Sequence, residues 1–178
     1  MKTNIALIGF MGSGKSAAGE LLALKLGRKF IETDALIEER AGKTITGIFR
    51  QEGEAFFRRL EHEVIKDVSG EENAIIACGG GVVLNNANIE LLKHSSVVVY
   101  LATAPSIILR RLATGGNRRP LLDVPDRAAR VRLMLEERRP LYEQAADIKI
   151  NTTNLNMEAL TARILQEQSG YAGKDIKK

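Results

Sequence analysis

The sequence lacks most of the residues and segments that mark secreted, membrane-spanning or nucleic-acid-binding proteins. A single cysteine, Cys78, excludes an internal disulfide, and we therefore expect a reducing, cytoplasmic location. No apolar run approaches the roughly 18–20 residues that cross a bilayer, and the N-terminal MKTNIALIGF has no signal-peptide features. Tryptophan is absent and only three Tyr and five Phe are present, which leaves few platforms for stacking bases. We expect neither a membrane nor a nucleic-acid partner.

The composition is that of a globular protein, with 44% hydrophobic and 27% charged residues. A chain of 178 residues without a linker or low-complexity block predicts one domain over residues 1–178, with a core of about 1–169 and a flexible tail at 170–178. The net charge is +4, and the segment from Arg110 to Arg139 holds nine arginines and no lysine. Arginine presents a planar fork that suits phosphate and carboxylate groups, which indicates anionic small molecules as ligands.

Short apolar segments alternate with helical patterns along the chain. Strands are expected at residues 4–9, 29–33, 74–78, 97–101 and 148–151. Helices are expected at residues 15–26, 34–39, 44–51, 54–68, 89–93, 105–113, 127–138 and 157–168. This alternation predicts a three-layer α/β/α domain around a five-stranded parallel sheet. Ligands of such sheets bind at the carboxyl ends of the strands.

The end of the first expected strand carries the most specific motif. Residues 9–16, GFMGSGKS, match G-x-x-x-x-G-K-[ST] between a strand and a helix. Glycines let backbone N–H groups converge on phosphate oxygens, and the start of the helix adds its positive dipole. Lys15 is then expected to reach the β- and γ-phosphates, and the Ser16 hydroxyl to bind Mg²⁺. A glycine-rich turn without a ligand is the alternative, and the strand–helix context disfavours it. The motif predicts a nucleoside triphosphate site.

Two carboxylates, Glu32 and Asp34, follow the second expected strand. Their spacing places both side chains on one side of an extended segment. One is expected to hold Mg²⁺ through water, and the other to orient an incoming hydroxyl and accept its proton. Asp34 also fits the N-cap of the next helix, a role compatible with the first.

Three further features each have a functional interpretation and a purely structural one. Glu54, Arg58 and Glu61 share a helix face, which without other evidence indicates a solvated surface. Three glycines at 79–81 allow close approach of a ligand to the backbone, or form a tight turn. The segment 114–125, TGGNRRPLLDVP, is expected to form a mobile lid over the phosphates with an arginine finger, or else an ordinary surface loop.

Together these segments resemble shikimate kinase, over roughly residues 5–151 and in the family's order. The matching pieces are GFMGSGKS, ETDALIE, IFRQEGEAFFRRLE, GGG, RRPLL and RRPLY. The resemblance implies a P-loop kinase that transfers the γ-phosphate of ATP to the 3-hydroxyl of shikimate, on the route to chorismate and the aromatic amino acids. It also implies one Mg²⁺ per subunit, ATP as co-substrate and a shikimate-binding region at about residues 34–61.

The resemblance implies a role for each matching position. Asp34, Lys15 and Arg119 would be catalytic, with Asp34 as the base and Arg119 as the lid arginine. The metal would be held by Ser16 directly and by Glu32 through water. ATP would bind Gly12, Ser13, Gly14, Lys15, Ser16, Ala17, Arg111 and Arg119.

Shikimate itself would be held by Asp34, Arg58, Gly80 and Arg138. The two arginines would bind the shikimate carboxylate, and the Gly80 N–H would donate a hydrogen bond to shikimate. Phe49 and Phe57 would wall the pocket behind the ring, although both are also expected to be core aromatics.

Three positions depart from the family pattern or leave a choice. Glu32 stands where the family usually has Asp, and Ala17 stands where it commonly has Thr. The arginine that contacts adenine falls one residue out of register, so Arg111 is preferred and Arg110 stays open. Another small-molecule kinase, such as a gluconate kinase, and a non-catalytic nucleotide-binding module are the alternatives. We expect a monomer, with Cys78 as a small buried hydrophobe and the two histidines without a role.

Overall fold

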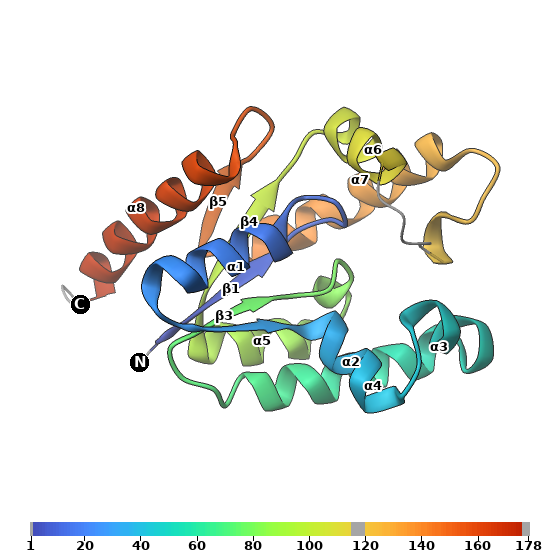
Figure 1. The fold of residues 1–178 in the computed structure, drawn as a ribbon, viewed down its shortest axis with the longest axis horizontal. Coiled ribbons are helices and arrows are strands. Elements are labelled where there is room, and N and C mark those ends of the chain that lie inside the picture. Colours follow the sequence, from blue (N-terminus) through green and yellow to red (C-terminus); the bar gives the residue numbers. More distant parts are fainter. Residues whose placement is uncertain (1, 115–119, 176–178) are drawn as a thin grey trace.

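The computed structural model describes residues 2–114 and 120–175 and contains one parallel sheet. Its five strands lie in the order β2-β3-β1-β4-β5, with every neighbouring pair parallel. The central strand β1 pairs with β3 on one side and β4 on the other (Figure 1). The strands are β1 (Asn4–Ile8), β2 (Lys29–Glu32), β3 (Ala74–Ala77), β4 (Ser96–Ala102) and β5 (Ile148–Asn151). The predicted α/β class and parallel sheet are confirmed.

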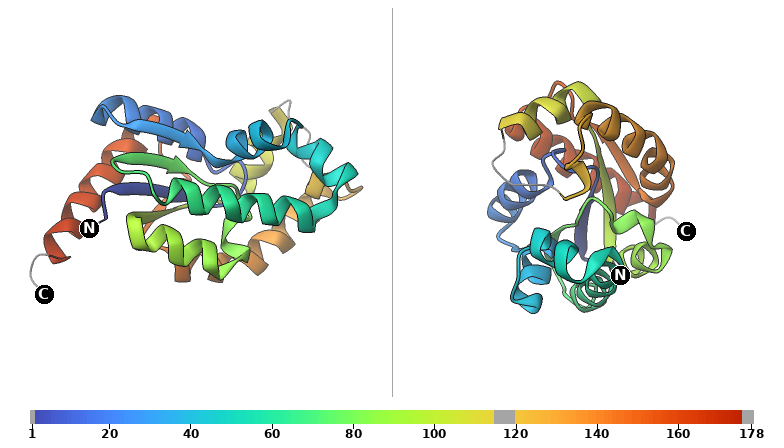
Figure 2. Two further views of the ribbon diagram at one scale, coloured as in Figure 1. Left: turned by 90° about the horizontal axis from the view of Figure 1, so that it is seen from below. Right: turned by 90° about the vertical axis from the view of Figure 1, so that its right-hand side faces the viewer.

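Helices cover both faces of this sheet. They are α1 (Lys15–Leu26), α2 (Thr33–Ala41), α3 (Ile45–Gln51), α4 (Gly53–Val68), α5 (Asn86–Ser95), α6 (Pro105–Thr114), α7 (Arg127–Ala145) and α8 (Met157–Asp175), with short 3-10 helices η1 (Val82–Leu84) and η2 (Pro120–Leu122). Successive strand residues point to opposite faces, so Ile5 and Leu7 of β1 pack under α1 and α8. Ala6 and Ile8 pack against α4, α5 and α7 instead. Figure 2 shows the sheet between these two helix layers.

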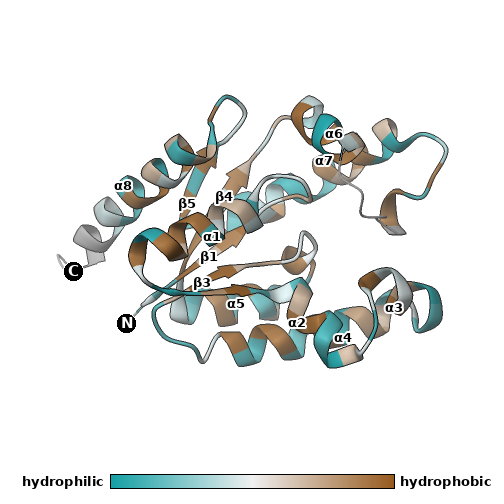
Figure 3. Cartoon of the chain, viewed as in Figure 1, coloured by the Kyte–Doolittle hydropathy of each residue, from teal (hydrophilic) through white to brown (hydrophobic). Residues whose placement is uncertain are grey.

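The inner strands are buried because both faces of the sheet are covered. All five residues of β1 and all four of β3 are buried, whereas the edge strands β2 and β5 carry exposed residues such as Lys29 and Lys149. The outer surfaces of the helices carry the hydrophilic residues (Figure 3). Within residues 2–114 and 120–175, no helix is both long and apolar enough to span a membrane.

Several helices extend beyond their expected limits, and α7, α5 and α8 differ most. The expectation that the helix after residue 127 ends at 138 is wrong, because α7 runs through Pro140 to Ala145. Proline disfavours a helical residue before it, but burial of Tyr142 and Ala145 in the core outweighs that local preference. Helix α5 is longer than expected at both ends, and α8 continues to Asp175 through part of the tail predicted to be flexible.

The parallel sheet brings three connecting segments together at the carboxyl ends of its strands. The loop after β1 leads into α1, the end of β2 leads directly into α2, and β3 leads into the three glycines before η1. These are the segments in which the sequence analysis places the site. The expected lid at 114–125 is described only at Thr114 and from Pro120 onward, where η2 precedes α7.

Candidate active site

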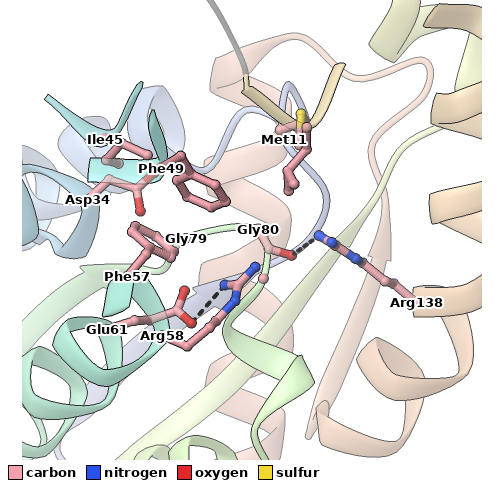
Figure 4. Close-up of a pocket in the computed structure, with 12 residues that line it drawn as sticks. Met11, Asp34, Ile45, Phe49, Phe57, Arg58, Glu61, Gly79, Gly80 and Arg138 are labelled. Atoms are coloured by element: carbon pink, nitrogen blue, oxygen red, sulfur yellow. Dashed lines mark hydrogen bonds and ion pairs between the residues drawn. The ribbon is translucent and has the colours of Figure 1, made fainter. Parts of the chain in front are cut away.

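Two adjoining pockets lie at the carboxyl ends of the strands. The nucleotide pocket, as we call the first, is lined by Met11, Gly12, Gly14, Lys15, Ser16, Ala17, Glu32, Asp34, Ala77, Cys78, Gly80 and Arg111. The acceptor pocket is lined by Met11, Asp34, Ile45, Phe49, Phe57, Arg58, Glu61, Gly79, Gly80, Gly81, Leu121 and Arg138 (Figure 4). Met11, Asp34 and Gly80 line both pockets and therefore stand where they meet.

The loop between β1 and α1 has the backbone of a phosphate cradle. Gly12 and Gly14 adopt φ angles of 77° and 96°, which only glycine adopts without strain. The Lys15 ammonium donates hydrogen bonds of 2.9 Å to the Gly9 carbonyl and 3.0 Å to the Phe10 carbonyl, so it lies across this loop. Because α1 begins at Lys15, the positive end of its dipole points into the nucleotide pocket.

A hydroxyl and a carboxylate meet at the floor of the nucleotide pocket. Ser16 Oγ donates a short hydrogen bond to Glu32 Oε1, which joins the start of α1 to the end of β2. Both are hard oxygen ligands of the kind that Mg²⁺ prefers, and this metal typically keeps several waters and substrate oxygens besides one or two protein ligands. The longer side chain of Glu32 thus reaches the place where the resemblance requires a carboxylate.

Arg111 reaches the nucleotide pocket from α6. Its guanidinium donates a 3.0 Å hydrogen bond to the Gly12 carbonyl, and it lines the pocket. Arg110 is not among the described residues that line this pocket. The geometry therefore favours Arg111 over Arg110 as the arginine beside the nucleotide.

Arg58 enters the acceptor pocket from α4 between two acidic side chains. Its guanidinium donates to Glu54 at 2.9 Å. It also donates to Glu61 at 2.9 Å (Figure 4). The Glu61 side chain is 1% exposed and that of Arg58 19%, so the interpretation of this helix face as solvated is wrong for both. Burial raises the pKa of Glu61 against the opposing effect of Arg58. Arg58 is thus held at the pocket by the buried carboxylate of Glu61 and by the exposed carboxylate of Glu54.

The opposite wall of the acceptor pocket comes from α7. Arg138 is 7% exposed and donates a 3.3 Å hydrogen bond to the Gly80 carbonyl (Figure 4). The Tyr142 hydroxyl donates to the same carbonyl at 2.5 Å. Arg58 and Arg138 therefore face the pocket from two different helices, and the two cationic groups are suited to hold an anionic ligand between them.

Asp34 lies in the first turn of α2, where it follows β2 directly. Its Oδ1 atom would be 2.6 Å from a side-chain carbon added to Gly79, so the glycine loop leaves room for this carboxylate. The N-cap of α2 is Glu32, and the capping role considered for Asp34 is therefore wrong. Thr33, between the two acids, accepts a 3.0 Å hydrogen bond from the Gly79 N–H and ties α2 to the glycine loop.

Aromatic and aliphatic side chains complete the acceptor pocket. The rings of Phe49 and Phe57 lie 4.9 Å apart between centroids, and Ile45 lies beside them (Figure 4). Phe57 also packs in the main core, as the alternative interpretation expects. The pocket is therefore apolar on one wall and charged on the others, which suits a compact ring that carries a carboxylate and hydroxyls.

Several pocket residues are not singled out as site residues by the sequence analysis. Glu61 is recognised only as part of a helix face. Met11 lies in the GFMGSGKS motif and Leu121 in the RRPLL segment, but neither position is given a role there. Tyr142 belongs to the RRPLY segment, which is the one clue to its position. Arg119, the expected lid arginine, lies outside the described residues.

Cys78 and the two histidines take no part in the acceptor pocket. Cys78 is 3% exposed, and burial raises the pKa of its thiol to about 12, as a small buried hydrophobe would show. His62 Nδ1 lies 2.7 Å from Oδ1 of the buried Asn88, between α4 and α5. Within the described ranges, no group of three or more His, Cys, Asp or Glu side chains is arranged to hold a metal.

Comparisons with known proteins agree with this geometry. A shikimate kinase from Symbiobacterium thermophilum is 44% identical and is matched over 92% of this chain and 95% of its own length. The structure of a shikimate kinase from Acinetobacter baumannii in complex with shikimate superposes with a TM-score of 0.91, at 38% identity, covering 96% of this chain and 94% of that one. A gluconokinase from Sinorhizobium meliloti, at 17% identity and a TM-score of 0.54 over 95% and 98% of the two chains, shares the fold alone. The family model described as shikimate kinase matches residues 11–169, and the chain belongs to this family.

Proposed function

We propose that this chain transfers the γ-phosphate of ATP to the 3-hydroxyl of shikimate, with Mg²⁺, and that the two pockets divide the reaction between them. Membership of the shikimate kinase family makes the chain a kinase of aromatic amino acid biosynthesis. The observation that carries the division of roles is the position of Asp34, which lines both pockets. A carboxylate there faces both the incoming hydroxyl and the phosphate that it attacks.

ATP binds in the nucleotide pocket. Backbone N–H groups at the start of α1 bind phosphate oxygens, and Lys15 exchanges the Gly9 and Phe10 carbonyls for the β- and γ-phosphates. Arg111 contacts the nucleotide from α6. The residues assigned to ATP are Gly12, Ser13, Gly14, Lys15, Ser16, Ala17, Arg111 and Arg119.

Ser16 and Glu32 hold Mg²⁺, with Ser16 as a direct ligand and Glu32 acting through water. The hydrogen bond from Ser16 Oγ to Glu32 Oε1, in the pocket that Lys15 also lines, supports this assignment. At this place Mg²⁺ would supply positive charge to offset the negative charge on the phosphates during transfer. Ala17 contributes only its backbone N–H, so the missing Thr hydroxyl costs little.

Shikimate binds in the acceptor pocket with its carboxylate between Arg58 and Arg138. The shikimate complex of the Acinetobacter baumannii relative supports this choice of ligand. The Gly80 N–H adds a backbone donor, and Phe49 and Phe57 pack against the ring. Binding of this kind fixes the orientation of the ring, and so which hydroxyl faces Asp34.

Asp34 accepts a hydrogen bond from the 3-hydroxyl, directs its oxygen at the γ-phosphorus, and takes its proton as the new bond forms. Phosphoryl transfer passes through a loose transition state, so positioning contributes more than removal of the proton early in the reaction. The bond from the γ-phosphorus to the β–γ bridging oxygen breaks, and ADP leaves. Arg119 is assigned to stabilise the transferring phosphoryl group from the lid.

Identification of the product tests this assignment. The protein is incubated with ATP, Mg²⁺ and shikimate, and the product is examined by phosphorus and proton magnetic resonance. A single phosphate on the 3-hydroxyl is the expected result. Phosphate on another ring hydroxyl, or a mixture, would contradict the proposed orientation between Arg58, Arg138 and Asp34.

We further propose that the chain acts as a monomer in the cytoplasm. The large hydrophobic side chains that are exposed in the described part of the chain lie on separate elements, including Leu24 on α1, Leu84 on η1 and Leu133 on α7. Light scattering coupled to size-exclusion chromatography is expected to give a mass near 19.5 kDa. A stable dimer at micromolar concentration would contradict it.

A further inference from the structure

The carbonyl of Gly80 is held by two side chains of α7. Tyr142 Oη donates to it at 2.5 Å, and an Arg138 guanidinium nitrogen donates at 3.3 Å. The two residues are four positions apart, so they lie one turn apart on the same helix face. Tyr142 is fully buried, at 0% exposure, and it is not among the residues that line either pocket. Its hydroxyl thus does not contact the pocket itself but binds the carbonyl of Gly80, which lines the pocket.

The rest of this loop is held from other directions. The Gly79 N–H donates to Thr33 Oγ1 at 3.0 Å, and the Gly79 carbonyl accepts from the Val82 N–H at 3.1 Å. Among the described residues, the Gly80 N–H has no hydrogen-bond partner. Three consecutive glycines have no side chains to restrict them and lose much conformational entropy on ordering. Hydrogen bonds therefore restrict the peptides on both sides of Gly80. The Val82 N–H holds the carbonyl of the Gly79–Gly80 peptide, and Tyr142 and Arg138 hold the carbonyl of the Gly80–Gly81 peptide.

The ring of Tyr142 is itself fixed in place. It stacks on Tyr100 with centroids 5.0 Å apart and planes 18° apart, and Tyr100 belongs to the central part of β4. Burial raises the pKa of the Tyr142 hydroxyl well above its ordinary value, so the hydroxyl keeps its proton and remains a donor. The Tyr142 hydroxyl is a rigidly held donor, whereas the glycine loop is flexible. Tyr142 therefore restricts the conformation of Gly80, rather than the reverse.

We propose that Tyr142 is a positioning residue for shikimate. Its hydroxyl fixes the Gly80 carbonyl, and with it the Gly80–Gly81 peptide, and through this shared acceptor it sets the place of the Arg138 guanidinium in the acceptor pocket. This inference rests on the proposed function, in which Gly80 and Arg138 hold shikimate. The nucleotide pocket is bounded by Gly80 but does not contain Arg138, so the effect falls mainly on shikimate.

Tyr142→Phe tests the inference because it keeps the stacked ring and removes only the hydroxyl. The dissociation constant for shikimate is measured by calorimetry without nucleotide, and the KM for shikimate and for ATP by a coupled assay. Loss of one well-formed hydrogen bond predicts about tenfold weaker shikimate binding, with the KM for ATP changed less than about twofold. Tyr100→Phe is the matched control, since it removes a hydroxyl from the partner ring, and it is expected to change shikimate binding less than about twofold.

Arg58→Lys is measured in the same series to separate the two proposals. If Arg58→Lys weakens shikimate binding and a folded Tyr142→Phe does not, the positioning role is wrong and the proposed function stands. If neither variant weakens it, both proposals fail. Equal weakening by Tyr100→Phe and Tyr142→Phe, or an equal rise in both KM values for Tyr142→Phe, would show a general effect on the fold and overturn the positioning role.

A second pair of variants covers the case in which Tyr142→Phe does not fold. Incorporation of 4-aminophenylalanine at position 142 keeps a donor at the same place on the ring, whereas 4-fluorophenylalanine fills the space without donating. The amino variant is expected to bind shikimate within about threefold of the unmodified protein, and the fluoro variant about tenfold more weakly. Equal affinities for the two variants would overturn the proposal.

Discussion

Glu32 is the residue at which the resemblance to the family leads one to expect Asp. It caps the start of α2 by its backbone position, and its carboxylate accepts the hydrogen bond of Ser16. The extra methylene relative to Asp therefore does not remove the oxygen from the edge of the nucleotide pocket. A carboxylate that acts through water tolerates such a change of length better than a direct ligand does.

We expect Glu32→Asp to retain at least about a tenth of the kcat, because a water can span the added gap to the metal. Glu32→Gln keeps the length and removes the charge, and is expected to raise the Mg²⁺ concentration needed for half-maximal rate. Both are measured by the coupled assay over a range of Mg²⁺ concentrations. A folded Glu32→Asp protein without activity would show that the longer carboxylate has a direct role.

Cys78 provides a test of burial at the residue scale. Its thiol has a pKa of about 12 in the folded chain, against 9.0 as the ordinary value. The folded state therefore keeps a proton that the unfolded state releases between pH 9 and 12, so stability is unaffected below pH 9 and falls as the pH rises above it. Relative to Cys78→Ala, the free energy of unfolding is expected to fall by about 1.4 kcal/mol between pH 8 and pH 10. Urea unfolding of both proteins measures this difference, and a difference independent of pH would refute it.

The glycine loop after β3 is the element on which the acceptor pocket depends. A side chain at Gly81 would overlap the Arg58 guanidinium, which is the movable end of a long side chain. A side chain at Gly9, in contrast, would lie 2.7 Å from the Leu101 carbonyl, and Gly9 has a φ of 146°. A side chain at Gly81 is therefore disfavoured by the Arg58 side chain of the acceptor pocket. A side chain at Gly9 is disfavoured by the backbone.

Gly81→Ala is expected to raise the KM for shikimate at least about tenfold, since it displaces a charged hydrogen-bonding group worth about 1.5–3 kcal/mol. Its thermal midpoint is expected to stay within a few degrees, because Arg58 can move aside. Gly9→Ala is expected to lower the midpoint strongly, because neither the backbone of Leu101 nor its own φ can adapt. Kinetics and thermal unfolding of both variants decide, and a loss of stability alone in Gly81→Ala would contradict the account.

Helices α4 and α7 show what the sequence could and could not predict. The P-loop and the acids after β2 were predictable because each is a short motif at the end of a strand, where the parallel sheet gathers its connections. The environment of Arg58 was not, because the same spacing to Glu54 and Glu61 occurs on solvated helices and only packing against the glycine loop buries it. The end of α7 was missed because Pro140 is a local signal, whereas burial of Tyr142 depends on contacts distant in sequence.

At the scale of the whole molecule, Asp147 joins segments from both ends of the chain. Its carboxylate accepts hydrogen bonds from Lys2 at 2.9 Å, from the Val98 N–H at 2.9 Å and from the Tyr171 hydroxyl at 3.1 Å. The group connects the N-terminus, β4 and α8, and its side chain is 13% exposed. It lies at the amino ends of the strands, whereas the two pockets lie at their carboxyl ends.

Asp147→Ala is expected to lower the free energy of unfolding by about 1–3 kcal/mol, because it leaves a buried N–H and an ammonium without their acceptor. The KM values for ATP and shikimate are expected to stay within about twofold in the folded protein. Glu167→Ala is the control, since its 2.7 Å pair with Arg163 is exposed and contributes little. Equal destabilisation by the two variants, or a selective loss of shikimate binding in Asp147→Ala, would contradict this assignment.

The most direct test of the whole account measures ADP formation with ATP and Mg²⁺ in the presence of shikimate, of gluconate, or of no acceptor. Asp34→Asn, which keeps the size of the side chain at the junction of the two pockets, is run beside the unmodified protein. We expect release of ADP that depends on shikimate and is lost in Asp34→Asn while ATP binding is retained. Turnover with gluconate alone, or full activity of Asp34→Asn with shikimate, would contradict it.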